Sequence, residues 1–222
     1  MLFDKDLVKS RQEAIGLILA GNVFIDSQRI DKPGTKVEIN CNLSLKKKYK
    51  TWVSRGGYKL DQAINEFDID CKDIIAMDIG SSTGGFTDVL IKKGAKKVYC
   101  VDVGYGQLDW NIRNDHRVTV LEKTNARYLD SKKIIEKLDA IVCDVSFISL
   151  KKVIKPNIKF LKTKGWLISL IKPQFEIGKD LLGKGGIVKN IEHHQMVLDD
   201  ITNFFENEIN LNVKGIIESP IL

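Results

Sequence analysis

The stretch MDIGSSTGGF, residues 77–86, decides the fold. An apolar run ends inside it, small residues follow, and a new apolar segment starts after the glycine pair, which is the pattern of a strand, a tight turn and a helix. Glycine suits such a turn because a ligand can then approach the backbone closely, and the first N–H groups of the helix remain free to bind it. The stretch therefore predicts a ligand site at the end of a strand.

The glycine spacing favours one class of ligand. A dinucleotide-binding turn shows G-x-G-x-x-G, whereas here the spacing is G-x-x-x-G-G with an acidic residue two places before the first glycine. This spacing fits S-adenosylmethionine better than a nicotinamide cofactor, so a dehydrogenase is the weaker alternative. The predicted cofactor contacts of this stretch are Asp78, Gly80, Ser82, Gly84, Gly85 and Phe86.

Working outward, the chain alternates short apolar runs with helical or irregular stretches. The runs cover residues 73–79, 97–102, 117–121, 138–144 and 165–171, with helices expected at 54–67 and 191–206 and one more strand at 211–217. This order predicts an α/β fold with a mostly parallel, Rossmann-like sheet.

Charged and polar residues follow several of these runs. Asp102 comes 22 residues after Gly80, where a carboxylate can accept hydrogen bonds from the ribose hydroxyls of an adenosine ligand, and Asn125 follows the third run as a candidate adenine contact. Asp144 and Lys172 close the fourth and fifth runs. Ligands of open parallel sheets bind outside the carboxyl ends of the strands, so we expect these side chains to converge there.

Composition excludes several classes of protein. The 222 residues are 43% hydrophobic and 29% charged, which is typical of a globular chain. No apolar run approaches the ~20 residues needed to span a bilayer, and the first ten residues are too charged for a signal peptide, so we expect a cytoplasmic protein without a membrane partner. The four cysteines form no C-x-x-C pair, which predicts free thiols and no metal site.

The net charge of +6 is concentrated in two regions. Residues 1–60 hold 12 Lys or Arg against 6 Asp or Glu, and residues 151–189 hold 10 Lys against 2 acidic residues. Two basic regions flanking a candidate site favour a polyanionic partner.

The first 50 residues predict a separate small module, followed by the α/β domain over residues 51–222. Ser10 and Glu13 form an S-x-x-E capping box, and Gly21 stands where a helix would end. Strands are expected at residues 23–26 and 36–39.

Five motifs carry a resemblance to a known family: SRGGYKL (54–60), DIG to GGF (78–86), CDVSFISL (143–150), IKPQFE (171–176) and GKGG (183–186). The chain resembles the TlyA or hemolysin A family of S-adenosylmethionine-dependent rRNA 2′-O-methyltransferases, which have an FtsJ-like catalytic domain. Its first segment looks like the RNA-binding module of ribosomal protein S-four. The resemblance implies ribosomal RNA or ribosomal subunits as partners, and cytidine as the methylated nucleotide.

The resemblance also implies a catalytic Lys-Asp-Lys-Glu tetrad. Lys59, Asp144 and Lys172 match its first three positions, with Lys172 as candidate general base and Lys59 stabilising negative charge. Glu218 precedes the stretch after which the family's glutamate lies and is not its equivalent, so we expect a chain shortened at both ends and lacking the closing strand. The phosphate contacts implied are Arg11, Lys46, Lys47, Lys48, Lys50 and Arg55.

Two further functions remain open at this point. A catalytically silent RNA-binding or ribosome-assembly protein is favoured by the missing fourth tetrad residue. A haemolysin is suggested only by the family's older name, because the sequence offers no suitable amphipathic or spanning segment. Among the aromatic residues, Trp52, Trp110 and Trp166 are expected to be packing residues, with Trp52 and Phe147 as possible RNA contacts.

Overall fold

The computed structural model describes residues 1–5, 7–8, 10–19, 21–26, 28–38, 41–45, 51–183 and 185–221. These residues form two compact units, Met1–Thr51 and Trp52–Leu222.

The first unit contains one helix and a small antiparallel sheet. Helix α1 (Arg11–Leu19) starts as expected, with the Glu13 N–H donating to Ser10 Oγ at 3.1 Å. The sheet has the order β2-β1-β3, with β1 (Val23–Ile25), β2 (Gln28–Ile30) and β3 (Leu43–Leu45).

The prediction of the second strand of this unit is wrong. Residues 36–38 form no strand, and β1 pairs instead with Gln28–Ile30. Asp26 adopts a left-handed backbone with φ 47°, which reverses the chain directly after β1. A tight turn at this position brings residues 28–30 beside β1.

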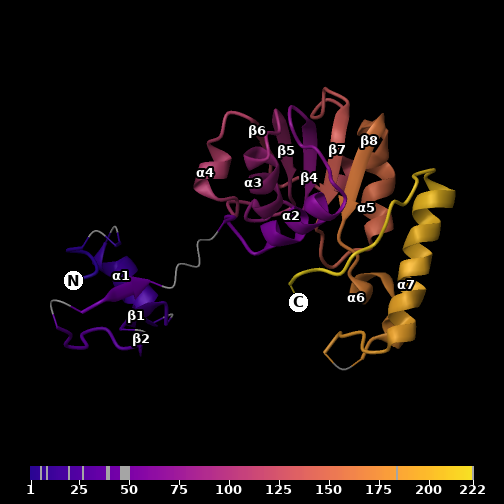
Figure 1. Ribbon diagram of the computed structural model, residues 1–222. Coiled ribbons are helices and arrows are strands. Elements are labelled where there is room, and N and C mark those ends of the chain that lie inside the picture. The colour runs from indigo at the N-terminus through magenta and orange to yellow at the C-terminus, as the bar shows by residue number, and fades with distance from the viewer. Residues whose placement is uncertain are drawn as a thin grey trace. The chain divides into compact units, whose positions relative to one another are not determined.

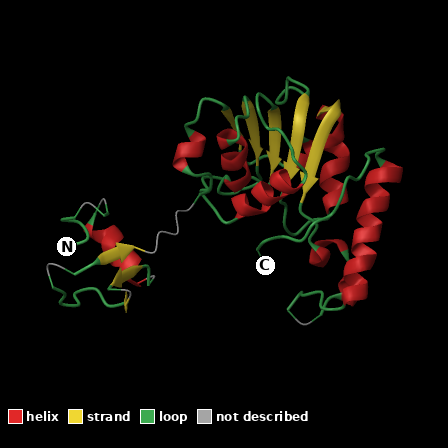
Figure 2. Cartoon of the chain, in the orientation of Figure 1, coloured by secondary structure: helices red, strands yellow, loops and turns green. Residues whose placement is uncertain are grey.

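The larger unit is built on a five-stranded parallel sheet with the order β6-β5-β4-β7-β8 (Figures 1 and 2). Its strands are β4 (Ile75–Ile79), β5 (Lys97–Val101), β6 (Val118–Leu121), β7 (Leu138–Cys143) and β8 (Leu161–Ser169). The α/β class and the parallel, Rossmann-like sheet are therefore confirmed. The five predicted runs correspond to these five strands.

Helices cover both faces of this sheet (Figure 1). On one face, α2 (Gly56–Glu66) and α3 (Gly85–Lys92) bury Leu60, Ile64 and Val89 against the sheet, near the short α4 (Trp110–Arg113). On the other face lie α5 (Leu150–Asn157) and α7 (Ile191–Asn203), while α6 (Pro173–Glu176) follows β8. Alternate residues of a strand therefore enter different clusters, as Ala76 and Met77 do.

Short turns complete the unit. They are the 3-10 turns η1 (Ala126–Tyr128), η2 (Ile158–Phe160) and η3 (Lys179–Leu181), and the π turn η4 (Phe204–Glu208). Within the described residues, no helix is both long and apolar enough to cross a membrane. All four cysteines are free, as predicted.

The strand expected at residues 211–217 does not form. Leu211 and Val213 pack against the apolar cluster beneath α5 and α7, but no described strand pairs with their backbone. The segment then passes α2, where Gln62 Nε2 donates to the carbonyl oxygen of Glu218 at 3.4 Å. Side-chain burial, and not ladder pairing, therefore holds this segment.

The central strand β7 offers a test of this core. Ile141 is completely buried, so we expect Ile141→Ala to lower the free energy of unfolding by about 2–5 kcal/mol through lost burial and the cavity left behind. Urea unfolding followed by tryptophan fluorescence reports on this unit alone, because Trp52, Trp110 and Trp166 all lie in it. Ile135→Ala, at a site 76% exposed, serves as the control. A loss below 1 kcal/mol in Ile141→Ala would contradict the packing described.

Candidate active site

A pocket of about 380 Å³ lies at the carboxyl ends of β4, β7 and β8. Nine residues predicted from the sequence line it: Arg55, Lys59, Asp78, Gly80, Ser82, Gly85, Phe86, Asp144 and Lys172. Six lining residues were not predicted: Ser54, Gly56, Ser81, Thr83, Ser146 and Ile221. Glu218 is exposed and is not among the described residues that line the pocket.

Two lysines converge on one carboxylate in this pocket. Asp144 Oδ2 lies 3.2 Å from Lys59 Nζ, and Asp144 Oδ1 lies 2.5 Å from Lys172 Nζ. Lys172 Nζ also donates to Ser146 Oγ at 2.9 Å. The three charged side chains are only about one-fifth exposed, at 20%, 18% and 21% for Lys59, Asp144 and Lys172. The cluster carries two positive charges against one negative charge, so it favours an anion.

The paired parallel strands β7 and β8 position Asp144 and Lys172. Asp144 follows β7, and its N–H donates to the carbonyl oxygen of Ile79 at 3.0 Å. Lys172 follows β8, whose last residues pair with the end of β7, and the Leu170 N–H extends this pairing by donating to the carbonyl oxygen of Cys143 at 2.9 Å. Pro173 then begins α6 and ends the extended run. Both side chains therefore leave the sheet at the same edge.

Lys59 reaches the cluster from the first turn of α2. The N-termini of α2 and α3 approach so closely that a Cβ atom on Gly57 would lie 3.1 Å from the carbonyl oxygen of Gly85. The Val53 N–H also donates to Asp88 Oδ2 at 2.9 Å, which ties the segment before α2 to α3. A glycine pair thus positions Lys59, and no strand-end rule could have found it.

Asp78 is wholly buried at the end of β4. Its Oδ2 accepts hydrogen bonds from Thr87 Oγ1 at 2.7 Å and from the Thr87 N–H at 3.1 Å, while Oδ1 has no partner in the described part of the chain. Burial raises the pKa of Asp78 to about 7, against the lowering effect of the Thr87 bonds, and the negative charges of Asp144 and Asp102 add to the increase. This carboxyl therefore presents an open acceptor to the pocket.

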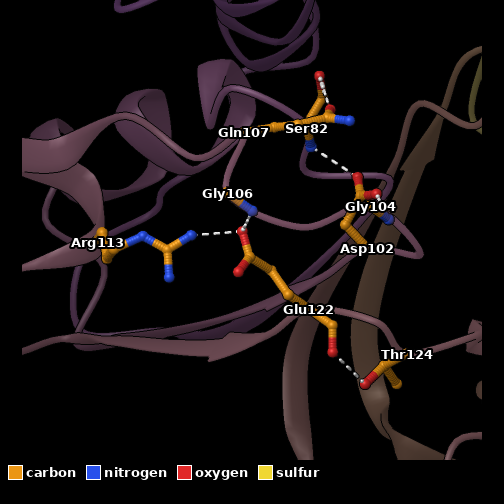
Figure 3. Close-up of polar contacts among 8 residues, drawn as sticks. All are labelled: Ser82, Asp102, Gly104, Gly106, Gln107, Arg113, Glu122 and Thr124. Atoms are coloured by element: carbon orange, nitrogen blue, oxygen red, sulfur yellow. Dashed lines mark hydrogen bonds and ion pairs between the residues drawn. The ribbon is translucent and has the colours of Figure 1, made fainter.

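Asp102 lies beside the glycine turn (Figure 3). Its Oδ2 accepts the Ser82 N–H at 2.8 Å and its Oδ1 accepts the Gly104 N–H at 2.7 Å. A carboxylate has about four acceptor sites, so each oxygen can still accept a ribose hydroxyl. The backbone bonds fix the carboxylate at the end of β5, next to the pocket.

Glu122 is a neighbouring carboxylate that the sequence reasoning missed (Figure 3). It accepts hydrogen bonds from Arg113 and, at 2.9 Å, from the Gly106 N–H. Burial acts to raise the pKa of Glu122. The hydrogen bonds from Arg113, Gly106 and the backbone of Gln107 outweigh burial and hold this pKa below its ordinary value. Since Glu122 directly follows β6, the strand-end rule that selected Asp144 could have found it.

Three predicted cofactor contacts have structural roles in this chain. Asn125 caps η1 by accepting the Arg127 N–H at 3.1 Å. Gly84 is the N-cap residue of α3 with φ 90°, and a Cβ atom there would lie 2.8 Å from Leu108 Cδ1. Phe86 is 4% exposed and belongs to the core beneath α3. Their cofactor contacts remain predictions.

The predicted phosphate contacts are distributed unevenly. Arg55 lines the pocket and Arg11 is exposed at the start of α1, while Lys46, Lys47, Lys48 and Lys50 lie outside the described residues.

The second basic region, residues 151–189, does not lie beside the pocket as one block. The lysines at its centre lie before β8, as Lys159 does, or in its first half, as Lys162 and Lys164 do. Lys172 follows the last residue of β8, so these three lysines lie toward the opposite end of the strand. The expectation for Trp110 is also wrong. Its side chain is 73% exposed on α4, because α4 buries Ile112 instead.

The parallel sheet, the glycine turn before α3 and the carboxylate after β5 define a Rossmann-like domain with an adenosine-type ligand site. Comparison with known proteins narrows this class. A family model described as FtsJ-like methyltransferase matches residues 52–221.

Two curated relatives and one solved structure agree with this match. YqxC of Bacillus subtilis is 42% identical over 223 residues, which covers 100% of this chain and 79% of YqxC. The 16S/23S rRNA (cytidine-2′-O)-methyltransferase TlyA of Mycobacterium tuberculosis is 45% identical over 188 residues, covering 84% of this chain and 70% of TlyA. A hemolysin-type structure from Streptococcus thermophilus has a TM-score of 0.77 at 40% identity, over 99% of this chain and 80% of that one.

The chain therefore belongs to the FtsJ-like methyltransferase family, in the group that includes TlyA and the hemolysin A proteins. This finding confirms the family predicted from the sequence motifs. The methyl donor of this family is S-adenosylmethionine.

The buried carboxyl of Asp78 makes stability depend on pH. Its pKa is raised to about 7 in the folded chain and is near 3.8 when unfolded, so the folded state binds the proton more tightly. Its contribution to the free energy of unfolding should therefore fall as pH rises from about 4 to about 7. Urea unfolding of wild type and Asp78→Asn at several pH values isolates this contribution, because Asn keeps the acceptor for Thr87. A stability difference between the two proteins that is independent of pH would contradict it.

Proposed function

We propose that this chain transfers a methyl group from S-adenosylmethionine to ribose 2′-hydroxyls of ribosomal RNA, with cytidine as the methylated nucleotide. The observation that carries the proposal is the Lys59–Asp144–Lys172 cluster beside the glycine turn. The substrate is supported by the relative named 16S/23S rRNA (cytidine-2′-O)-methyltransferase, which is 45% identical to this chain.

The pocket residues fit the cofactor. The unpartnered Oδ1 of Asp78 is a suitable acceptor for the cationic amino group of S-adenosylmethionine, and the carboxylate of Asp102 suits its ribose hydroxyls. When bound, the cofactor would supply an electrophilic methyl group on a positively charged sulfur, with a neutral thioether as the leaving group.

The three charged residues of the cluster have separate roles in the proposed methyl transfer. Lys172 in its amine form takes the proton of the 2′-hydroxyl on Nζ, as a general base. Asp144 orients both amino groups through its two oxygens. Lys59 stabilises the negative charge that develops on the ribose oxygen, since a compact cation in a largely buried pocket interacts strongly with such a charge.

The N-terminal unit, Met1–Thr51, is proposed to be an S-four-type RNA-binding module, with Trp52–Leu222 as the methyltransferase domain. Its basic residues, Arg11 among them, would supply phosphate contacts and a strong dependence of affinity on salt. Methylation of a 2′-hydroxyl also requires an RNA substrate, because DNA has no 2′-hydroxyl.

Calorimetric titration with S-adenosylmethionine, followed by transfer of labelled methyl groups to ribosomal RNA and to intact subunits, tests the proposal. Binding with transfer to 2′-hydroxyls supports it. Binding without transfer to any of these substrates favours the silent RNA-binding alternative, and absence of binding contradicts the cofactor assignment.

Lys172→Ala should reduce methyl transfer by about 100-fold or more, which is the usual contribution of a general base. Affinity for S-adenosylmethionine should stay close to wild type, because Asp78 and Asp102 are unchanged. Lys164→Ala removes an exposed lysine from the opposite end of β8 and is the matched control. Undiminished transfer by Lys172→Ala would refute its role as the base.

We propose that Phe147 stacks on the substrate base. It lies three residues after Asp144, its side chain is 91% exposed, and its backbone is left-handed with φ 64°. The ring contacts Phe175 with a centroid distance of 5.1 Å, so it is supported from one side. A strained, exposed aromatic residue beside a catalytic pocket is well suited to stack on a nucleobase.

Phe147→Ala should raise the KM for RNA by about tenfold or more, because stacking on one base contributes ~1–3 kcal/mol. Phe147→Tyr keeps the aromatic face and should stay near wild type. Transfer assays at varied RNA concentration, with calorimetry of the cofactor as control, separate the two effects. An unchanged KM in Phe147→Ala would exclude the stacking role.

A further inference from the structure

The serine two residues after Asp144 contacts the candidate base directly. Ser146 Oγ accepts a hydrogen bond from Lys172 Nζ at 2.9 Å, while Asp144 Oδ1 lies 2.5 Å from the same nitrogen. All three side chains line one pocket. We propose that Ser146 is a positioning residue that, together with Asp144, directs the lone pair of Lys172 Nζ into this pocket. The inference rests on the proposed role of Lys172 as the base.

The argument follows from the geometry of an amine. Neutral Nζ is tetrahedral, with one bond to carbon, two N–H bonds and one lone pair. Asp144 Oδ1 lies within ion-pair distance of Nζ but accepts no hydrogen bond within the described residues, so the ion pair alone leaves rotation about the carbon–nitrogen bond open. The hydrogen bond to Ser146 Oγ fixes one N–H, and the charge of Asp144 attracts the other, which leaves one direction for the lone pair. Fixing that direction aligns the base with its proton before reaction.

The loop that carries Ser146 is anchored to the segment that carries Lys172. Glu176 Oε1 accepts the Leu150 N–H at 2.7 Å, which joins α6 to the first turn of α5. The Phe147–Phe175 ring contact makes a second link between the same two segments. The segment after Ser146 is therefore held against the segment after Lys172, which keeps the Ser146 hydroxyl within hydrogen-bond distance of Nζ.

Ser146→Ala tests the inference, with Ser149→Ala as the matched control, because Ser149 precedes α5 and makes no side-chain cap. We expect at least tenfold lower kcat in Ser146→Ala with unchanged cofactor affinity. The acid limb of its pH profile should move to lower pH, because the ammonium form loses an acceptor. The charged groups that share the pocket, Asp144, Lys59, Arg55 and Asp78, are unchanged. Ser146→Thr keeps the hydroxyl and should recover most of kcat.

The outcomes distinguish this inference from the proposed function. If Lys172→Ala is inactive while Ser146→Ala keeps wild-type kcat and pH profile, the base stands and the role of Ser146 is overturned. A lower kcat in Ser146→Ala without a shifted acid limb, or without recovery in Ser146→Thr, would indicate a merely structural role and also overturn it. If Lys172→Ala itself is fully active, the base assignment fails first.

Discussion

The close contact between Gly80 and the backbone of Asp144 is the constraint on which the site depends. Gly80 has φ 82°, and a Cβ atom there would lie 2.7 Å from the carbonyl oxygen of Asp144. Any larger residue would therefore both strain the turn and push the end of β4 away from the end of β7. Asp78 precedes this glycine by two residues. The contact between Gly80 and Asp144 therefore sets the distance between the buried carboxyl of Asp78 and the carboxylate of Asp144, which contacts both lysines. The glycine is required by protein packing as much as by a ligand.

The charge balance of the cluster follows from that placement. Asp144 is shared between Lys59 and Lys172, and one carboxylate cannot neutralise two ammonium groups. With side chains only about one-fifth exposed, water screens the excess positive charge poorly. The pocket therefore attracts a phosphate or a developing oxyanion, whereas the wholly buried Asp78 offers an open acceptor that suits a cationic amino group. Opposite charge preferences thus lie at neighbouring points of one pocket.

The sequence predicted what depends on chain direction and missed what depends on side-chain contacts. The end of a parallel strand is readable from an apolar run, which is why Asp102, Asp144 and Lys172 were found. Lys59 required the family resemblance, since its position comes from the packing of one helix N-terminus on another through Gly57. Ser146 lies inside a recognised motif, yet only the 2.9 Å contact with Lys172 Nζ shows what its hydroxyl touches. The strand expected at residues 211–217 failed because apolar alternation indicates burial and does not supply a partner strand.

Charge counted along the chain is a poor guide to charge at the site, and β8 shows why. β8 runs beside Leu138–Cys143 of β7, five residue steps or about 17 Å at ~3.3 Å per residue, so Lys162 near its start and Lys172 beyond its end lie toward opposite ends of the strand. At 0.15 M ionic strength the screening length is about 8 Å, so the lysines at the far edge contribute little to the field in the pocket. Local attraction for RNA phosphate must therefore come from Lys59, Lys172 and Arg55, which line the pocket. Further affinity must come from basic residues that contact the RNA elsewhere, which is the role we propose for the N-terminal unit.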